Sequence, residues 1–138
     1  MQHQSVYITD YDMKRLRSFL GKSRNWLPEE AELLRKLKHR LDTAVVIAQK
    51  EAPPYLVTMH SHVGITDSEE QEEKDFWLVY PDEAMFGENQ LSIMSELAVS
   101  VLGTKVGDRV FVTNGEVVKV WRVAFLYYQP EASEHYKL

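Results

Sequence analysis

The sequence contains no cysteine, so the chain forms neither a disulfide nor a thiolate metal site. It also lacks any apolar run close to the roughly 20 residues that a membrane-spanning helix needs. The first ten residues hold neither a basic stretch nor an apolar segment, which argues against a signal peptide. Together these absences predict a protein of the reducing cytoplasm that has no contact with a membrane. No internal repeat is present, and the sequence predicts neither a cofactor nor a bound metal.

Charge is distributed unevenly along the 138 residues. Residues 1–50 hold ten Lys or Arg and six Asp or Glu, whereas residues 51–138 hold six and fifteen. The net charge of -5 therefore combines a basic N-terminal third with an acidic remainder. This asymmetry is consistent either with two surfaces for different partners or with two solvated faces.

Two amphipathic helices are predicted before residue 53. The first begins at Thr9 or Asp10, whose side chain caps a helix, and Gly21 ends it. The second begins at Pro28, a residue that favours the first helical position, and continues to the Ala-Pro-Pro sequence at 52–54. The two helices are expected to pair as an antiparallel hairpin. Apolar residues of the second helix follow the alternating spacing of a coiled-coil seam: Leu34, Leu37, Leu41, Ala44 and Ala48.

From residue 55 the apolar period changes from helical to twofold, which predicts strands. An acidic loop is expected at 67–74, and Ser95 is placed to cap a short helix that Gly103 ends. Asn114-Gly115 is a strong signal for a tight hairpin. The predicted strands are 55–66, 76–80, 91–94, 109–113 and 116–128.

The predicted fold class is therefore α+β. Residues 1–52 form a short helical hairpin, and residues 53–138 form an antiparallel sheet that curls around one short helix. The proline pair at 53–54 is the one credible boundary between these two parts.

Four segments in the second half, together with one at the start, carry a resemblance to a known family. The segments VTMHSHV (57–63), LVYP (78–81), LSIMSELAVSVLGTKVGD (91–108) and YQPEA (128–132) resemble the C-terminal domain of the Gre transcript-cleavage factors. ITDYDMKRLRSFL (8–20) resembles the start of the Rnk-type members of this group. The resemblance to the Gre/Rnk family implies an FKBP-like C-terminal domain that docks on RNA polymerase near the rim of its secondary channel. It also implies a helical hairpin that projects from that domain.

The hairpin of this chain departs from the Gre pattern. In Gre factors a long hairpin carries acidic residues that help hold the second catalytic Mg²⁺ of the polymerase, because carboxylates complete a hard-cation site. Here the hairpin is much shorter, and the loop at its tip, 21–27, has no acid. We therefore expect polymerase binding without stimulation of transcript cleavage, in competition with longer-armed factors. The predicted tip residues are Lys22, Arg24, Trp26, Glu29 and Glu30.

The resemblance places the polymerase-docking patch on a strand-to-helix turn. Ser92 keeps the family residue, Met94 matches Rnk-type chains, and Glu96 replaces the usual proline. Without the resemblance, Met94 is more simply a core residue and Ser95 a helix cap. With it, an exposed thioether suits a binding surface, because its flexibility adapts to irregular partners. The predicted patch consists of Ser92, Met94, Ser95, Glu96 and Leu97.

The predicted hairpin also carries a basic face. This face either contacts acidic polymerase walls or nucleic acid, or it is a solvated face with local ion pairs such as Glu32–Lys36, and the solvated face is favoured. Trp26 is expected to pack under Leu27 and Phe19, and the scarcity of aromatic residues argues against a dedicated single-strand binder. The members of the basic hairpin face are Lys14, Arg15, Arg17, Lys36 and Arg40.

Two histidines and one arginine of the predicted sheet have simple interpretations. His60 and His62 are expected on one face of a strand, a spacing that can ligate Zn²⁺. No third ligand is evident, so two half-exposed polar residues are the favoured interpretation. Arg122 is expected to pair with one of the many acidic residues.

Three other functions compete with a polymerase-binding module. A peptidyl-prolyl isomerase shares the FKBP-like fold but needs a concave aromatic pocket, whereas strand alternation sends the aromatic residues to both faces. A transcript-cleavage elongation factor needs a longer arm. Direct regulation of nucleoside diphosphate kinase rests only on the name of the Rnk-type members. The leading expectation is a monomeric, non-enzymatic transcription regulator that binds RNA polymerase.

Overall fold

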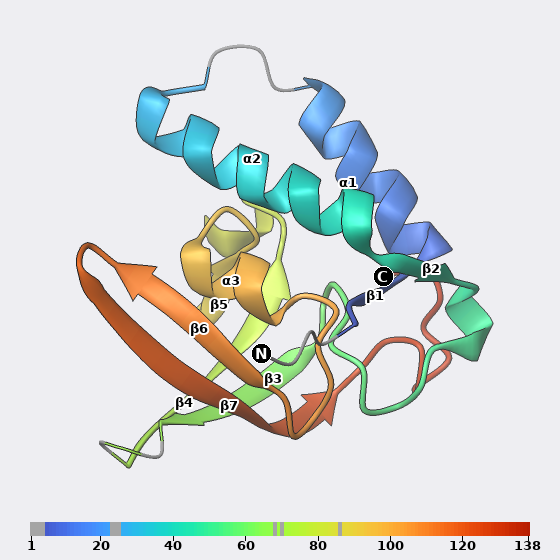
Figure 1. The fold of residues 1–138 in the computed structure, drawn as a ribbon. Coiled ribbons are helices and arrows are strands. Elements are labelled where there is room, and N and C mark those ends of the chain that lie inside the picture. The colour runs from blue at the N-terminus through green and yellow to red at the C-terminus, as the bar shows by residue number, and fades with distance from the viewer. Residues whose placement is uncertain (1–4, 23–25, 68, 70, 86) are drawn as a thin grey trace.

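The computed structural model describes residues 5–22, 26–67, 69, 71–85 and 87–138. Two helices, α1 (Asp10–Lys22) and α2 (Pro28–Thr43), fold back on each other and lie across a β-rich body (Figure 1). The Thr9 hydroxyl caps α1, because it accepts a hydrogen bond of 3.1 Å from the Asp12 backbone N–H. The predicted α+β fold with an N-terminal helical hairpin is confirmed.

Five strands form one sheet in the spatial order β5-β4-β3-β7-β6. The strands are β3 (His62–Asp67), β4 (Glu72–Val79), β5 (Gln90–Ser92), β6 (Arg109–Asn114) and β7 (Val117–Tyr128). All neighbouring pairs are antiparallel except β4 and β5, which are parallel. The sheet is therefore mixed, and the prediction of an antiparallel sheet is wrong at this edge. The chain reaches β5 through a longer connection that contains the 3₁₀ turn η2 (Glu83–Met85), whereas a tight hairpin would have reversed its direction.

The short helix α3 (Glu96–Val101) lies between the sheet and α2 (Figure 1). Ser95 caps this helix as predicted, since its hydroxyl oxygen accepts a hydrogen bond of 3.2 Å from the Ala98 backbone N–H. Gly103 follows the helix with a φ of 81°, the left-handed conformation that commonly ends a helix.

Helix α2 is shorter than the sequence predicts, because it ends at Thr43. The three residues of β2 (Val45–Ile47) are all β-branched, and such residues favour strands over helices. They pair in parallel with β1 (Tyr7–Thr9), a two-stranded sheet that the sequence did not reveal. The predicted helical positions of Ala44 and Ala48 are therefore wrong, and the coiled-coil seam does not extend beyond α2. The 3₁₀ turn η1 (Gln49–Glu51) leads into the proline pair.

The strand predicted at 55–66 forms only in its second half, as β3. The residues before it turn instead, and His60 has a positive φ of 66°. Contacts distant in sequence hold this segment, because the side-chain amide of Gln129 donates hydrogen bonds of 2.7 Å to the carbonyls of Pro53 and Leu56. The local alternation of polar and apolar residues is thus overridden by tertiary hydrogen bonds.

The hairpin predicted at Asn114-Gly115 is confirmed. Strands β6 and β7 pair directly across it, and Gly115 has the positive φ of 67° that such a turn requires. The acidic segment predicted as a loop at 67–74 is partly strand, because β3 continues to Asp67 and β4 begins at Glu72.

Both helices of the hairpin share one hydrophobic core with the sheet. Leu16 of α1 and Leu37 and Leu41 of α2 are almost completely buried. They belong to the same cluster as Ile93 before α3 and Trp121 of β7. The hairpin therefore packs along the body, which restricts how far it reaches.

Replacing Gly103 with Ala is expected to destabilise the fold by about 2 kcal/mol. An added Cβ would collide with the Val6 side chain and lie 2.9 Å from the Tyr7 carbonyl oxygen, at a φ that L-residues rarely adopt. Gly21→Ala is the matched control, because a Cβ there meets nothing within 4 Å. Urea denaturation measures both variants, and equal midpoints would contradict the prediction.

Candidate functional site

The predicted docking turn is held in shape by serine hydroxyls. The Ser92 hydroxyl oxygen accepts a hydrogen bond of 3.0 Å from the Met94 backbone N–H. The Ser95 hydroxyl donates a hydrogen bond of 2.9 Å to the Ser92 carbonyl and also caps α3. Because both serines bond within the turn, they fix the direction of the side chains between them.

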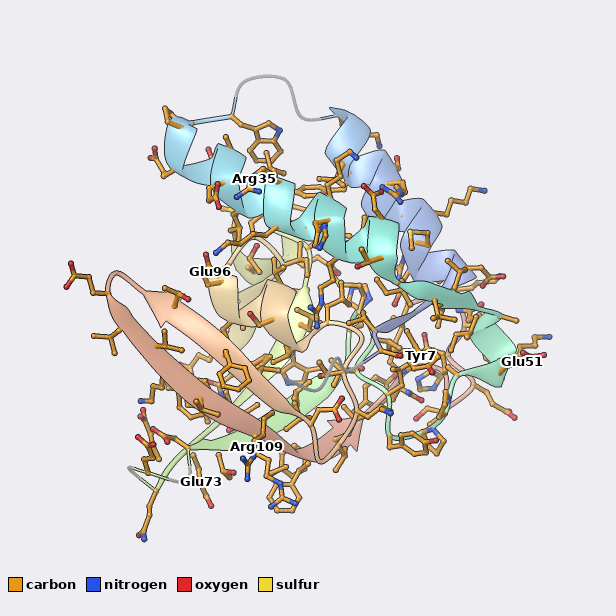
Figure 2. The ribbon with its side chains drawn as sticks, viewed as in Figure 1. Tyr7, Arg35, Glu51, Glu73, Glu96 and Arg109 are labelled. Atoms are coloured by element: carbon orange, nitrogen blue, oxygen red, sulfur yellow. The ribbon has the colours of Figure 1, made fainter. Side chains whose placement is uncertain are left out.

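The other patch residues are half-buried. Met94 and Leu97 pack against the core but remain partly exposed. They are therefore neither fully buried core residues nor fully exposed surface residues. Glu96 projects from the start of α3 towards α2 (Figure 2) and forms an ion pair of 2.6 Å with the Nζ of Lys36. The patch is therefore continuous with one face of the hairpin.

Arg40 of α2 binds the end of α3. Its Nε donates to the Leu102 carbonyl at 2.7 Å, and its Nη2 donates to the Ser100 carbonyl at 2.8 Å. These carbonyls lie at the negative end of the α3 dipole, where a cation is favourable. Burial lowers the pKa of Arg40 to about 10, so the side chain remains charged at neutral pH. Arg40 and Lys36 thus fasten α2 to both ends of α3.

The predicted basic hairpin face is largely neutralised by partners within the chain. Arg15 pairs with Asp12 at 2.6 Å, and Arg17 pairs with Asp42 at 2.8 Å. Within the described residues, Lys14 and Arg40 are the members of this face for which we find no ion pair, and Arg40 bonds backbone carbonyls instead. The predicted Glu32–Lys36 pair is wrong, because Glu32 pairs with Arg35 while Lys36 binds Glu96 on α3.

The hairpin tip is closed by aromatic packing. The rings of Trp26 and Phe19 lie 5.9 Å apart in an edge-to-face arrangement, which confirms the predicted contact with Phe19. The Glu30 carboxylate accepts a hydrogen bond of 3.1 Å from the Leu27 backbone N–H and so caps α2. Lys22 and Glu29 are exposed, and Arg24 lies outside the described residues.

A buried polar cluster joins α1 to the body, and the sequence did not reveal it. Asp12 is only 1% exposed and accepts a hydrogen bond of 3.0 Å from the Met59 backbone N–H, in addition to its ion pair with Arg15. The Arg15 guanidinium lies 4.2 Å from the centre of the Tyr11 ring and 5.4 Å from that of Tyr80. Burial raises the pKa of Asp12, whereas Arg15 and the Met59 N–H oppose that rise.

A groove of about 900 Å³ lies beside this cluster, between α1 and residues 80–83. His60 lines it and its Nε2 lies 2.8 Å from the Glu83 carboxylate. His62 instead stacks on Trp77 and contacts Asp75, so the prediction that both histidines share a face is wrong. The turn at His60 separates the two rings. Within the part of the chain that the structure describes, no group of three or more His, Asp or Glu is arranged to hold a metal ion.

A second buried carboxylate, Glu131, anchors the C-terminal segment. The Thr58 hydroxyl donates to it at 2.7 Å, and burial raises the pKa of Glu131 above its ordinary value of 4.5. The folded chain therefore holds a proton that the unfolded chain releases. For this reason the stability of the protein should fall as pH rises from about 4.5 through the folded-state pKa.

Replacing Glu131 with Gln is expected to remove this loss of stability. The amide has no charge, and it retains an oxygen that can accept the Thr58 hydrogen bond. The stability of the variant relative to the unmodified protein should rise with pH across the window above about 4.5 and then become constant. Urea unfolding between about pH 4 and pH 8 measures the difference, and parallel curves would refute the assignment.

No helix in the described ranges is long and apolar enough to cross a membrane. The aromatic residues considered for an isomerase pocket divide between the two faces of the sheet, because an irregularity in the β3–β7 pairing turns Phe125 to the face opposite Trp121. Trp121 is buried, whereas Phe111, Phe125 and Tyr127 are exposed.

Comparison with known proteins identifies the family. A family model described as "Transcription elongation factor, GreA/GreB, C-term" matches residues 52–125. The chain is 32% identical over 141 residues to the "Regulator of nucleoside diphosphate kinase" of Escherichia coli K12, and the match covers 100% of both chains. It is also 32% identical over 97 residues to the transcription elongation factor GreB of Pseudomonas aeruginosa, covering 70% of this chain and 57% of GreB.

A solved structure gives the same result. The "Prokaryotic transcription elongation factor GreA/GreB from Nitrosomonas europaea" superimposes with a TM-score of 0.72 at 26% identity, over 91% of this chain and 100% of that one. The family match covers more than half of the chain, and the similarity to the Escherichia coli regulator covers all of it. The chain therefore belongs to the GreA/GreB family of transcription factors, within which it is of the Rnk type.

Proposed function

We propose that the chain binds RNA polymerase through the turn at 92–97, near the rim of the secondary channel, and does not stimulate transcript cleavage. Membership of the GreA/GreB family supports polymerase as the partner. The turn is a suitable docking element because its serines hold it rigid, while Met94, Glu96 and Leu97 remain partly accessible. A preformed surface of this kind loses little conformational entropy on binding.

The observation that carries the second half of the proposal is the short hairpin packed on the body. Helix α2 has 16 residues, which corresponds to roughly 24 Å. Its buried leucines and the Arg40 bonds to α3 fasten it along the body. A carboxylate at the tip therefore lies close to the docking domain and does not reach a distant magnesium site.

The charges at the tip support the same conclusion. Of the two nearest acids, Glu30 bonds the Leu27 backbone N–H and stabilises the start of α2. Glu29 is exposed, and the cation Lys22 lies at the end of α1. A metal site built by a partner needs paired carboxylates that are free to coordinate. Here one exposed acid is free for that role.

A transcript-cleavage assay on backtracked elongation complexes tests this proposal. The chain should bind the complexes and leave the transcript length unchanged, whereas GreB in parallel shortens it. Glu29→Gln should change neither result, because no role in catalysis is assigned to that carboxylate. Robust cleavage that Glu29→Gln or Glu30→Gln abolishes would overturn the proposal.

A further inference from the structure

The face of the sheet turned away from α3 carries three exposed aromatic residues. Phe111, Phe125 and Tyr127 are 65%, 54% and 60% exposed, respectively. Phe111 directly follows Val110, whose side chain enters the core. Phe125 follows the core residue Val123 after a bulge in the pairing of β3 with β7. Exposed apolar patches of this extent mark interaction surfaces more often than free surface.

The aromatic residues form an ordered layer. The ring of Tyr127 rests on Gly64 of β3, where a Cβ would lie 2.9 Å from it. His62 connects this ring to Trp77 of β4, with ring centres 4.9 Å from Tyr127 and 4.5 Å from Trp77. Phe125 stacks on Tyr127 at 5.8 Å. The rings thus contact one another across β7, β3 and β4, so this layer is organised before any partner binds.

Charges of opposite sign lie on the same face as these rings, on different strands of the sheet. On one side, Arg109 of β6 and Arg122 of β7 occupy directly opposed positions, and like charges placed this way repel. Neither has an ion pair with the described residues, so the predicted pairing of Arg122 with an acid is wrong. On the other side, Glu73 and Asp75 of β4 are exposed. Figure 2 shows Arg109 and Glu73 on the side of the sheet away from α3.

We propose that this face binds a second copy of the chain to form a symmetric dimer. A twofold axis that runs along the strands between β3 and β7 places β4 of one copy over β6 of the other, because the strand order is β4-β3-β7-β6. Within one copy, Glu73, Thr66, Arg122 and Arg109 lie in one row across the four strands. The twofold axis therefore sets Glu73 of one copy opposite Arg109 of the other, beside Arg122. Phe125 lies in the next row along the strands, where it pairs with Gly64, so the two aromatic layers meet beside this charged row.

The distribution of charge selects a second copy over other partners. Both signs lie on the same face, on opposite sides of the proposed axis, which is the pattern of a self-complementary interface. A nucleic-acid surface would carry cations without the two acids of β4. The docking turn and α3 lie on the opposite face of the sheet (Figure 1), so dimerisation leaves the proposed polymerase contact open.

Sedimentation velocity of the intact chain over a range of concentrations tests the dimer. The unmodified protein should dimerise reversibly by about 100 µM. Phe125→Ser should weaken the dimer at least about tenfold, because it removes a central aromatic contact. Met85→Ser is the matched control: Met85 is 81% exposed but lies off this face, and dimerisation should be unchanged.

A charge exchange separates a specific interface from nonspecific association. Arg109→Glu and Glu73→Arg should each weaken the dimer, and the double variant should recover it, because the cross-copy pair is restored with reversed signs. A monomer at about 1 mM would overturn the proposal. So would a dimer that none of these substitutions weakens, or a monomer that uses Phe125 to bind a different protein or single-stranded nucleic acid.

Discussion

Met94→Asp should lower the affinity of the chain for core RNA polymerase by about 100-fold. The substitution places a charge on the half-buried thioether at the centre of the docking turn, between two serines whose hydrogen bonds fix its direction. On binding, that carboxylate would be desolvated against an apolar contact, which is unfavourable. Fluorescence anisotropy with labelled chain and core polymerase measures the affinity.

Two control variants separate a lost contact from a lost fold. Met94→Leu preserves volume and apolar character and should keep the affinity within a few-fold. Met85→Asp introduces the same charge at a side chain that is 81% exposed and lies outside residues 92–97, and it should have no effect. If Met94→Asp binds as tightly as the unmodified chain while its thermal unfolding is unaltered, the turn is not the docking site.

Arg15→Met should destabilise the fold by about 3 kcal/mol, the largest effect expected for a residue outside the hydrophobic core. The substitution keeps the length of the side chain and removes the cation that is paired with the buried Asp12. It leaves a carboxylate without its partner in a site where burial already raises its pKa. Chemical denaturation at neutral pH measures the change.

A double-mutant cycle identifies the cause of this loss. Asp12→Asn combined with Arg15→Met removes both charges, and the amide oxygen still accepts the Met59 hydrogen bond. The double variant should therefore be more stable than Arg15→Met alone. The two losses would simply add if Arg15 acted only through packing against Tyr11 and Tyr80.

Much of the fold was predictable because its signals are local. Helix α1, the cap at Ser95 and the hairpin at Asn114-Gly115 each depend on neighbouring residues, and each is confirmed. The parallel edge pair β4–β5 and the β1–β2 sheet were not predictable in the same way. Their pairing partners lie far apart in sequence, and no single-strand pattern specifies them.

The candidate site was only partly predictable. The turn at 92–97 followed from a family resemblance, and its serine hydrogen bonds have the geometry expected of a cap. The partners of Lys36 and Arg40 on α3 could not be found from helical spacing, because they lie about 60 residues further along the chain. The favoured interpretation of a solvated basic face was therefore incomplete: several of its cations hold the hairpin to the body.

The segments that carry the family resemblance also contribute to the packing of α1 on the body. Asp12, Met59, Tyr80 and Glu131 lie in four different segments of the resemblance, and all four lie in or beside the buried polar cluster. Those segments therefore include residues that seat α1 on the body. Only the segment that contains the turn at 92–97 includes the proposed polymerase contact.

Competition for core RNA polymerase between the unlabelled chain and labelled GreB tests the central claim most directly. We predict that the chain displaces GreB in a concentration-dependent manner, that Met94→Asp fails to do so, and that no transcript is shortened as GreB leaves. If GreB stays bound at saturating concentrations of a folded chain, the chain does not use the GreB contact, and the proposed docking site is contradicted.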